Sequence, residues 1–273
     1  MELQAYRMDG LGNDFIIIDR RKKKIDLTQD AILKIADRKI GIGCDQVIII
    51  DKDKEKKTDA KITFFNSDGG QVAACGNGSR CISFFLMQEK NKKKSSINTE
   101  SGILTAQLKQ ANEISIDMGK PSFLWNKIPL VKKMNHKKVL IKLKNNQSFI
   151  GYTLSVGNPH IIIFKNITIE KLKEIGPVIE HHNYFPERCN VTFARILDRK
   201  NIEIKVWERG AGLTQACGTA ACATVVASSK QRLTGRQASI HFKNGTLHIH
   251  WQPNNRIIMT GSVSPIYKVS LNI

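Results

Sequence analysis

Residues 62–81 read ITFFNSDGGQVAACGNGSRC, and residues 202–222 read IEIKVWERGAGLTQACGTAAC. In each stretch a strand-like apolar run is followed by a glycine-containing loop, and a cysteine then stands directly before a glycine. A polar residue, Asn66 or Glu208, ends each run nine residues before that cysteine. The two stretches therefore indicate two copies of one structural unit.

The correspondence continues outward from the two cysteines. A Gly-Asn pair ends at Asn13, 62 residues before Cys75, and another ends at Asn158, 59 residues before Cys217. A loop glycine follows the first cysteine by 27 residues and the second by 28. Landmarks in one order and at nearly one spacing indicate an internal duplication. We expect two halves, each with a strand, a glycine loop, a cysteine and a helix.

Strand-like segments outnumber helical segments along the chain. Most are alternating or β-branched runs, and Asn244-Gly245 between two of them predicts a β-hairpin. The predicted strands cover residues 15–19, 47–50, 62–65, 103–108, 114–118, 139–143, 160–164, 202–207, 239–242 and 246–251, and the predicted helices cover 28–38 and 169–175, with two more beginning at Gly76 and Gly218. These patterns predict the α+β class, without regular βαβ alternation.

The composition excludes several classes of protein. The chain is 41% hydrophobic, and none of its apolar runs reaches the roughly 18–20 residues that a membrane span needs. The first ten residues lack the pattern of a secretory signal. Six cysteines in 273 residues are too few for a disulfide scaffold, and Cys44, Cys81, Cys189 and Cys222 are expected to be buried core residues. We therefore expect a cytoplasmic protein with reduced cysteines and no membrane partner.

The net charge of +19 raises the alternative of a basic nucleic-acid-binding protein. The excess positive charge lies in short lysine-rich clusters between apolar segments, without the interleaved aromatic residues of a base-stacking surface. Lysine also outnumbers arginine in these clusters, whereas base recognition favours arginine. The preferred interpretation is a lysine-rich surface. Retention on heparin with a steep salt dependence, together with no enzymatic activity, would support the alternative.

Cys75 and Cys217 each precede a predicted helix, where unsatisfied backbone N–H groups create a positive end. This setting favours a lowered thiol pKa and a bound anion. If the two units face each other, one thiolate removes a proton from an α-carbon while the other thiol delivers a proton to the opposite face. That chemistry is two-base racemisation or epimerisation. The cysteine spacings do not fit a zinc site, and the Gly-rich motifs of nucleotide binding are incomplete.

Seven motifs taken together resemble diaminopimelate epimerase, from near residue 5 to the last predicted strand. They are MetAspGlyLeuGlyAsnAspPhe at 8–15, GlyCysAspGln at 43–46, PheAsnSerAspGly at 65–69, AlaCysGlyAsnGlySerArgCys at 74–81, GlyAsnProHis at 157–160, PheProGluArgCysAsnVal at 185–191 and GluArgGlyAlaGlyLeuThrGlnAlaCysGlyThr at 208–219. Gly70 and Ala220 depart from the family pattern.

The resemblance implies two structurally similar halves, each a mostly antiparallel sheet wrapped around a central helix, with the active site in the cleft between them. The first half would comprise residues 1–118 and 264–273, including a returning last strand at 266–271, and the second would comprise residues 119–263. The implied reaction interconverts LL- and meso-2,6-diaminopimelate on the route to lysine and peptidoglycan. The implied enzyme uses no pyridoxal phosphate, other cofactor or metal, and its partner is the small-molecule substrate rather than nucleic acid. The oligomeric state stays open, with a homodimer as one option.

The resemblance also implies roles for individual residues. Cys75 and Cys217 are the acid/base pair, and His160 and Glu208 tune the thiols. The backbone N–H groups of Gly76, Asn77, Gly218 and Thr219 hold the reacting carboxylate; Asn66, Asn158, Asn190 and Arg209 hold the distal carboxylate; Glu208 binds an ammonium group; and Asn13 and Gln46 complete the pocket. A related cysteine-pair racemase of the proline or hydroxyproline type is the nearest enzyme alternative. It is disfavoured because Glu208, Arg209 and Asn190 suit a second charged amino-acid head that those substrates lack.

Overall fold

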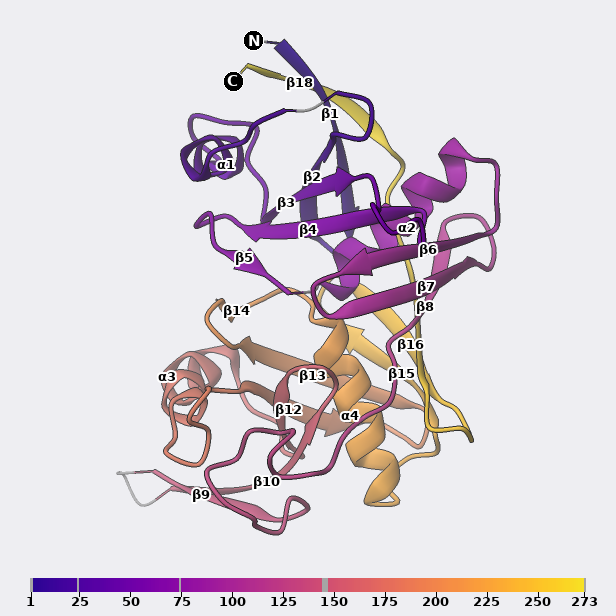
Figure 1. Cartoon of the computed structure of the whole chain (residues 1–273). Coiled ribbons are helices and arrows are strands. Elements are labelled where there is room, and N and C mark those ends of the chain that lie inside the picture. The colour runs from indigo at the N-terminus through magenta and orange to yellow at the C-terminus, as the bar shows by residue number, and fades with distance from the viewer. Residues whose placement is uncertain (1, 24, 74, 144–146, 273) are drawn as a thin grey trace. The chain divides into compact units, whose positions relative to one another are not determined.

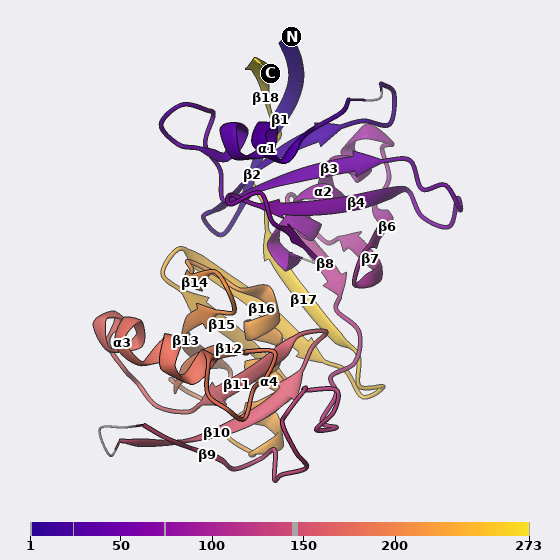
Figure 2. The same cartoon turned by 60° about the vertical axis from the view of Figure 1, so that its left-hand side comes forward.

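A computed structural model describes residues 2–23, 25–73, 75–143 and 147–272 (Figures 1 and 2). The fold is mixed α/β and contains a large amount of mixed sheet. The chain divides into unit 1, Met1–Asp117 with Thr260–Ile273, and unit 2, Met118–Met259. Ala74, which belongs to the motif at 74–81, lies outside the described residues. No helix in the described part of the chain is long and apolar enough to cross a membrane.

Unit 1 is built on a continuous series of paired strands. Its strands are β1 (Glu2–Gly10), β2 (Asn13–Asp19), β3 (Gln46–Asp51), β4 (Ala60–Asn66), β5 (Gln71–Val72), β6 (Lys94–Thr99), β7 (Gly102–Leu108), β8 (Glu113–Asp117) and β18 (Tyr267–Asn272). The pairing order is β18–β1–β2–β3–β4–β6–β7–β8, with β5 also on β4. The β2–β3 and β4–β6 pairs are parallel, and the other pairs in this series are antiparallel. Figure 1 shows the last strand, β18, beside the first, β1.

Unit 2 repeats this order of pairs. Its strands are β9 (Val139–Lys142), β10 (Ser148–Ser155), β11 (Pro159–Ile163), β12 (Asn190–Ile196), β13 (Asn201–Glu208), β14 (Gly212–Leu213), β15 (Gln237–Phe242) and β16 (Gly245–Trp251), and β17 (Ile257–Ser262) leads back to unit 1. The series is β9–β10–β11–β12–β13–β15–β16, with β14 on β13. Its parallel pairs, β11–β12 and β13–β15, stand at the positions of the parallel pairs in unit 1.

Four helices occur in the described residues, two in each unit. They are α1 (Gln29–Ala36), α2 (Gly76–Glu89), α3 (Ile169–Glu180) and α4 (Gly218–Lys230). The hydroxyls of Thr28 and Thr168 cap α1 and α3 by accepting the backbone N–H groups of Ala31 and Lys171. These two helices form the crossovers that the parallel pairs β2–β3 and β11–β12 require.

Helices α2 and α4 are buried over most of their length; α4 carries small and apolar residues on every side, whereas α2 also buries Asn77 and Arg80. Helix α2 packs against β1, β6, β7 and β8 within unit 1, and α4 packs against β10, β11, β12, β15 and β16 within unit 2. Each of these helices begins directly after one of the two cysteines of the repeat. Each unit therefore holds a cysteine at the N-terminus of a helix fixed by its own core.

The elements expected from the sequence are largely confirmed. The predicted helix starts at Gly76 and Gly218 are correct, and the Asn244-Gly245 hairpin forms between β15 and β16, with Phe242 paired to Gly245. Helix α3 runs to Glu180, beyond the predicted end at residue 175. The four cysteines expected in the core are buried, and this burial raises the pKa of Cys44 to about 12. The strand pattern missed β1, β6, β10, β12 and β17, together with the two-residue strands β5 and β14.

Gly78 lies where helix α2 meets the strands beneath it. A Cβ at this position would lie 2.9 Å from Cε1 of Phe64 and 3.0 Å from Cδ1 of Ile48. We expect Gly78→Ala to lower the free energy of unfolding by about 1–3 kcal/mol, because the helix would have to shift off these side chains. Urea denaturation measures the change. Gly235→Ala, where the nearest contact of a Cβ is 4.0 Å away, is the control. Equal stability of the two variants would contradict this packing argument.

Candidate active site

Cys75 is the N-cap residue of α2, with an extended backbone at φ −139° and ψ 116°. Its Sγ accepts a hydrogen bond from the backbone N–H of Gly78 at 3.3 Å. The first turn of the helix contains no acidic side chain that would neutralise the positive helix end. The arrangement leaves a partly exposed sulfur beside backbone donors suited to an anion.

Three polar residues of unit 1 lie at the ends of neighbouring strands: Asn13 on β2, Gln46 on β3 and Asn66 on β4. Gln46 begins β3 and pairs in register with Asn66, the last residue of β4, and its Nε2 donates to Asn66 Oδ1 at 2.8 Å. Asn13 begins the neighbouring parallel strand β2, and its Oδ1 lies 3.9 Å from the Sγ of Cys75, which donates to it. Unit 1 thus brings Asn13 to Cys75 and joins Gln46 to Asn66.

Asn77 is buried behind Cys75 in the first turn of α2. Its side-chain Oδ1 accepts from the fully buried Arg80 guanidinium at 2.9 Å. The side chain of Asn77 therefore binds Arg80 within unit 1. Only the backbone N–H of Asn77 would contribute to an anion site. Arg80 was not among the site residues expected from the sequence, although it belongs to the quoted motif at 74–81.

Cys217 occupies the same position in unit 2, as the N-cap of α4 with φ −130° and ψ 113°. Its side chain is 5% exposed, and its Sγ lies 3.4 Å from Oγ1 of Thr219. The thiol also donates a hydrogen bond to the carboxylate of Glu208, the last residue of β13. The first turn of α4 likewise contains no acidic residue.

The electrostatics of Cys217 correct one expectation from the sequence. Burial, followed by the negative charge and hydrogen bond of Glu208, raises the pKa of the Cys217 thiol well above its ordinary value. Burial likewise raises the pKa of Glu208. The prediction that the helix end lowers the thiol pKa is wrong for Cys217, because loss of hydration and a neighbouring carboxylate outweigh the helix end. In this structure Cys217 is a protonated thiol that faces a potential proton acceptor.

His160 lies on β11 and is fully buried. Its Nε2 is 2.8 Å from Asn158 Oδ1, and Asn158 Nδ2 donates to Thr219 Oγ1 at 3.3 Å. Burial, followed by the charge of Arg209, lowers the pKa of His160 to about 3, so the ring is neutral near pH 7 and Nε2 carries the proton toward Asn158. His160 therefore reaches Cys217 through Asn158 and Thr219, whereas Glu208 contacts the thiol directly.

Asn190 joins the start of β12 to the residue that follows β13. Its Nδ2 donates to the carbonyl of Pro159 at 2.9 Å, and its Oδ1 accepts from the backbone N–H of Arg209 at 3.0 Å. The guanidinium of Arg209 donates to the carbonyl of Glu187 at 3.2 Å and stays exposed. A buried amide thus fixes the backbone from which an exposed cation projects.

The strand registers match the polar positions of the two units. In unit 1 Phe15 pairs with Gln46, and in unit 2 His160 pairs with Asn190, both in parallel strands. The corresponding residues of units 1 and 2 are Asn13 and Asn158, Phe15 and His160, Gln46 and Asn190, Asn66 and Glu208, and Cys75 and Cys217. At these corresponding positions the two units differ chemically, because the carboxylate of Glu208 and the imidazole of His160 have no counterpart in unit 1.

The sequence profile described as diaminopimelate epimerase matches residues 5–124 and 152–266, which include both cysteines and the polar residues around them. The chain belongs to the diaminopimelate epimerase family. Family members are isomerases of lysine biosynthesis. The chain is 46% identical to a diaminopimelate epimerase of Pelagibacter ubique, over the full length of both proteins. It is 41% identical to the diaminopimelate epimerase of Caulobacter vibrioides, covering 96% of this chain and 94% of that one.

Among solved structures, the fold is similar to a hydroxyproline epimerase from Agrobacterium vitis with a TM-score of 0.69. The match covers 100% of this chain and 93% of that chain at 12% sequence identity. At this identity the likeness concerns the fold alone. The diaminopimelate epimerase fold is thus shared with racemases that act on other amino acids.

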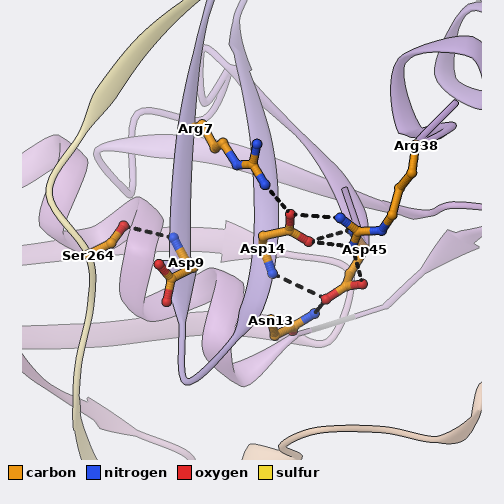
Figure 3. A network of polar contacts seen from close by, with 7 residues as sticks. All are labelled: Arg7, Asp9, Asn13, Asp14, Arg38, Asp45 and Ser264. Carbon is orange, nitrogen blue, oxygen red and sulfur yellow. Dashed lines mark hydrogen bonds and ion pairs between the residues drawn. The ribbon is translucent and has the colours of Figure 1, made fainter. Parts of the chain in front are cut away.

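Sequence reasoning missed three charged residues around Asn13 in this member of the diaminopimelate epimerase family. Asp14, Arg38 and Asp45 form the network drawn in Figure 3. A signal was present, because Asp14 and Asp45 each lie beside a residue that the motifs had singled out. The motifs did not indicate that Asp14 and Asp45 contact each other, since the two residues lie about thirty residues apart in sequence.

Proposed function

We propose that the protein is a two-base epimerase that interconverts LL- and meso-2,6-diaminopimelate, for lysine and peptidoglycan precursor synthesis, without pyridoxal phosphate. The observation that carries the proposal is the repeated Cys-Gly helix start, at Cys75 and Cys217, in a chain that matches diaminopimelate epimerases along its full length. Six cysteines in 273 residues are too few for the disulfide scaffold of an exported protein, and we therefore assign the enzyme to the cytoplasm.

In the proposed organisation, residues 1–118 with 264–273 form one catalytic half and residues 119–263 form the other. Each half is a mostly antiparallel sheet around a central helix, and the reaction takes place in the cleft between the halves. The division of the chain into compact units and the matching strand order within them support this organisation. The two-base mechanism itself requires both thiols to reach one α-carbon from opposite faces.

The proposed reaction begins with the carboxylate beside the reacting carbon bound at the helix starts, by the backbone N–H groups of Gly76, Asn77, Gly218 and Thr219. One sulfur, as a thiolate, takes the α-proton, and the electron pair of the broken C–H bond moves onto the carbon and its carboxylate. The other thiol gives its proton to the opposite face and becomes the thiolate. For Cys217 to act as the base, its proton must first move to Glu208, whose raised pKa favours accepting it.

In this proposal the distal amino-acid head is bound by Asn66, Asn158, Asn190 and Arg209, with Glu208 near an ammonium group and with Asn13 and Gln46 completing the pocket. The exposed guanidinium of Arg209, on a backbone fixed by Asn190, suits bidentate binding of a carboxylate. The two charged heads of diaminopimelate match this set of groups better than proline or hydroxyproline does. For this reason we rank a proline or hydroxyproline racemase as the second candidate function.

We expect Arg209→Lys to lower kcat/KM for diaminopimelate by about tenfold, because a point charge replaces a planar pair of donors and one good hydrogen bond to a charged group is lost. Steady-state kinetics measure the change. Lys205→Arg, on β13 and away from the proposed pocket, is the control and should behave as the wild type. Full activity of the Arg209 variant, or efficient racemisation of free lysine by the wild type, would exclude a pocket with two charged heads.

The deciding experiment is incubation of the purified protein with LL-diaminopimelate in deuterated water. We expect NMR to show α-deuterium in the substrate pool together with the appearance of the meso isomer. Proline, hydroxyproline and lysine should remain unlabelled in parallel samples. If diaminopimelate stays unlabelled, the proposed function is wrong. Labelling of proline instead would favour the racemase alternative.

A further inference from the structure

The network around Asn13 links a catalytic candidate to charged residues with no role in the site so far (Figure 3). Asp45 lies in the loop before β3, and its Oδ2 accepts from Asn13 Nδ2 at 2.7 Å. A carboxylate only accepts hydrogen bonds, so the amide nitrogen of Asn13 must face it. The carbonyl oxygen of Asn13 is thereby turned toward Cys75, where it accepts from the thiol.

Asp45 is itself fixed by Arg38, from the same crossover segment, and by Asp14 on β2. Arg38 donates to Asp45 Oδ1 at 2.8 Å, and Asp45 Oδ2 also accepts from the backbone N–H of Asp14 at 3.2 Å. In return, the backbone N–H of Asp45 donates to Asp14 Oδ1 at 3.0 Å. These reciprocal bonds connect the start of β2 to the loop that leads into β3.

Asp14 is the buried carboxylate of the network and binds both of its arginines. It is 9% exposed and binds both Arg7, at 2.7 Å, and Arg38, at 2.8 Å. Burial alone would raise its pKa, but the hydrogen bonds of Arg38 and of the Asp45 N–H and the charges of Arg38 and Arg7 leave the Asp14 pKa lowered. The two carboxylates of Asp14 and Asp45 and the two guanidiniums of Arg7 and Arg38 thus pair with one another and balance in charge.

We propose that Asp45, fixed by Arg38 and Asp14, is a positioning residue that holds the Asn13 amide in the orientation that faces Cys75. The inference rests on the proposed function in that Cys75 is taken as a reacting group. Asn13 can present either an acceptor or a donor to the sulfur, and these two faces have opposite effects. The carbonyl oxygen stabilises the thiol, whereas a released amide that turned its N–H toward the sulfur would stabilise the thiolate.

The test replaces Asp45 and follows Cys75 directly. In Asp45→Asn the carboxylate that dictates the amide orientation is lost, and a negative charge is removed. We expect iodoacetamide to alkylate Cys75 several-fold faster at pH 7.5, measured by peptide mapping, while Cys217 in the same sample reacts at its wild-type rate. Epimerase turnover should fall about tenfold, because the Asn13 amide beside the Cys75 thiol is no longer held in its orientation.

The control is the same substitution at the far end of β3, the strand that begins directly after Asp45. Asp51 ends β3 and pairs with Arg20 through two hydrogen bonds, of 2.7 and 3.0 Å. Asp51→Asn should leave the alkylation of Cys75 and the turnover unchanged. A purely structural role of Asp45 makes a different prediction, since a loosened loop would expose the neighbouring Cys44, which is 1% exposed. Alkylation of Cys44 together with Cys75 would therefore overturn the proposal.

A double substitution tests whether Asp45 acts through Asn13. When Asn13→Ala is already present, Asp45→Asn should change the alkylation rate of Cys75 by less than about twofold, because the residue that carries the effect is gone. An undiminished effect in that background, or an unchanged Cys75 rate in Asp45→Asn alone, would refute the assignment. The alkylation rates need no turnover, so they decide this inference even if the wild type fails to epimerise diaminopimelate.

Discussion

Alanine at Cys75 or at Cys217 is expected to lower epimerisation of diaminopimelate by at least about 10²-fold, because each substitution removes one of two positioned acid/base groups. The fold should persist, since each cysteine is an N-cap whose helix is held by its own unit. Turnover of LL-diaminopimelate to the meso isomer measures the loss, and circular dichroism measures the helix content.

The two buried cysteines further along the same helices provide matched controls. Cys81→Ala and Cys222→Ala make the same chemical change on α2 and α4, inside the core. Both should keep most of the turnover while losing some stability. Exchange of the α-hydrogen for deuterium without inversion, in a single variant of Cys75 or Cys217, would agree with one remaining base. Inversion at more than about a tenth of the wild-type rate in either variant would eliminate the two-base assignment.

Glu208→Gln is expected to have the second largest effect, lowering turnover by about 10–10²-fold. The amide still accepts a hydrogen bond from the Cys217 thiol but does not take up its proton. Because the charge of Glu208 raises the pKa of Cys217, the same substitution should lower that pKa and speed alkylation of Cys217 at a fixed pH. Steady-state kinetics and the pH dependence of alkylation measure the two effects, which run in opposite directions.

Glu203→Gln is the control for this experiment. Glu203 lies on the same strand, β13, but pairs with Arg195 and Lys205 at the surface. Its replacement should change neither turnover nor the reactivity of Cys217. If the Glu208 variant keeps wild-type turnover, the carboxylate is not needed to receive the Cys217 proton.

The sequence predicted the parts of the fold that depend on local patterns. Both cysteine-led helices could be located because a glycine loop and a small-residue run follow each apolar strand. Strand β12 was missed although polar and apolar residues largely alternate in its sequence NVTFARI; its first five residues are all buried, so its burial does not follow that alternation. Strand β6 was missed because its sequence KSSINT is mostly polar, and pairing with β4 and β7 determines its conformation.

The residue types of the candidate site were predictable from the sequence, but the contacts between these residues were not. The repeat alone related Asn66 to Glu208 and Cys75 to Cys217, and the registers of β3–β4 and β12–β13 agree with the first of these relations. The raised pKa of Cys217 was not predictable, because it depends on burial and on the approach of Glu208 from another strand. The connection of Asp45 to Asn13 is likewise a tertiary contact, which no local pattern encodes.

The pairing of β1 with β18 has a consequence for the order of folding. Unit 2 is one continuous segment, Met118–Met259, so its contacts form within a single stretch of the chain. Unit 1 is made of two segments, and its strand β1 pairs from Leu3 to Arg7 with Leu271 to Tyr267, at least 260 residues away in sequence. Because closing so long a loop costs conformational entropy before the strands pair, we expect β1 and β18 to pair late in folding. Until then one edge of β1 is unpaired and open to association with other chains.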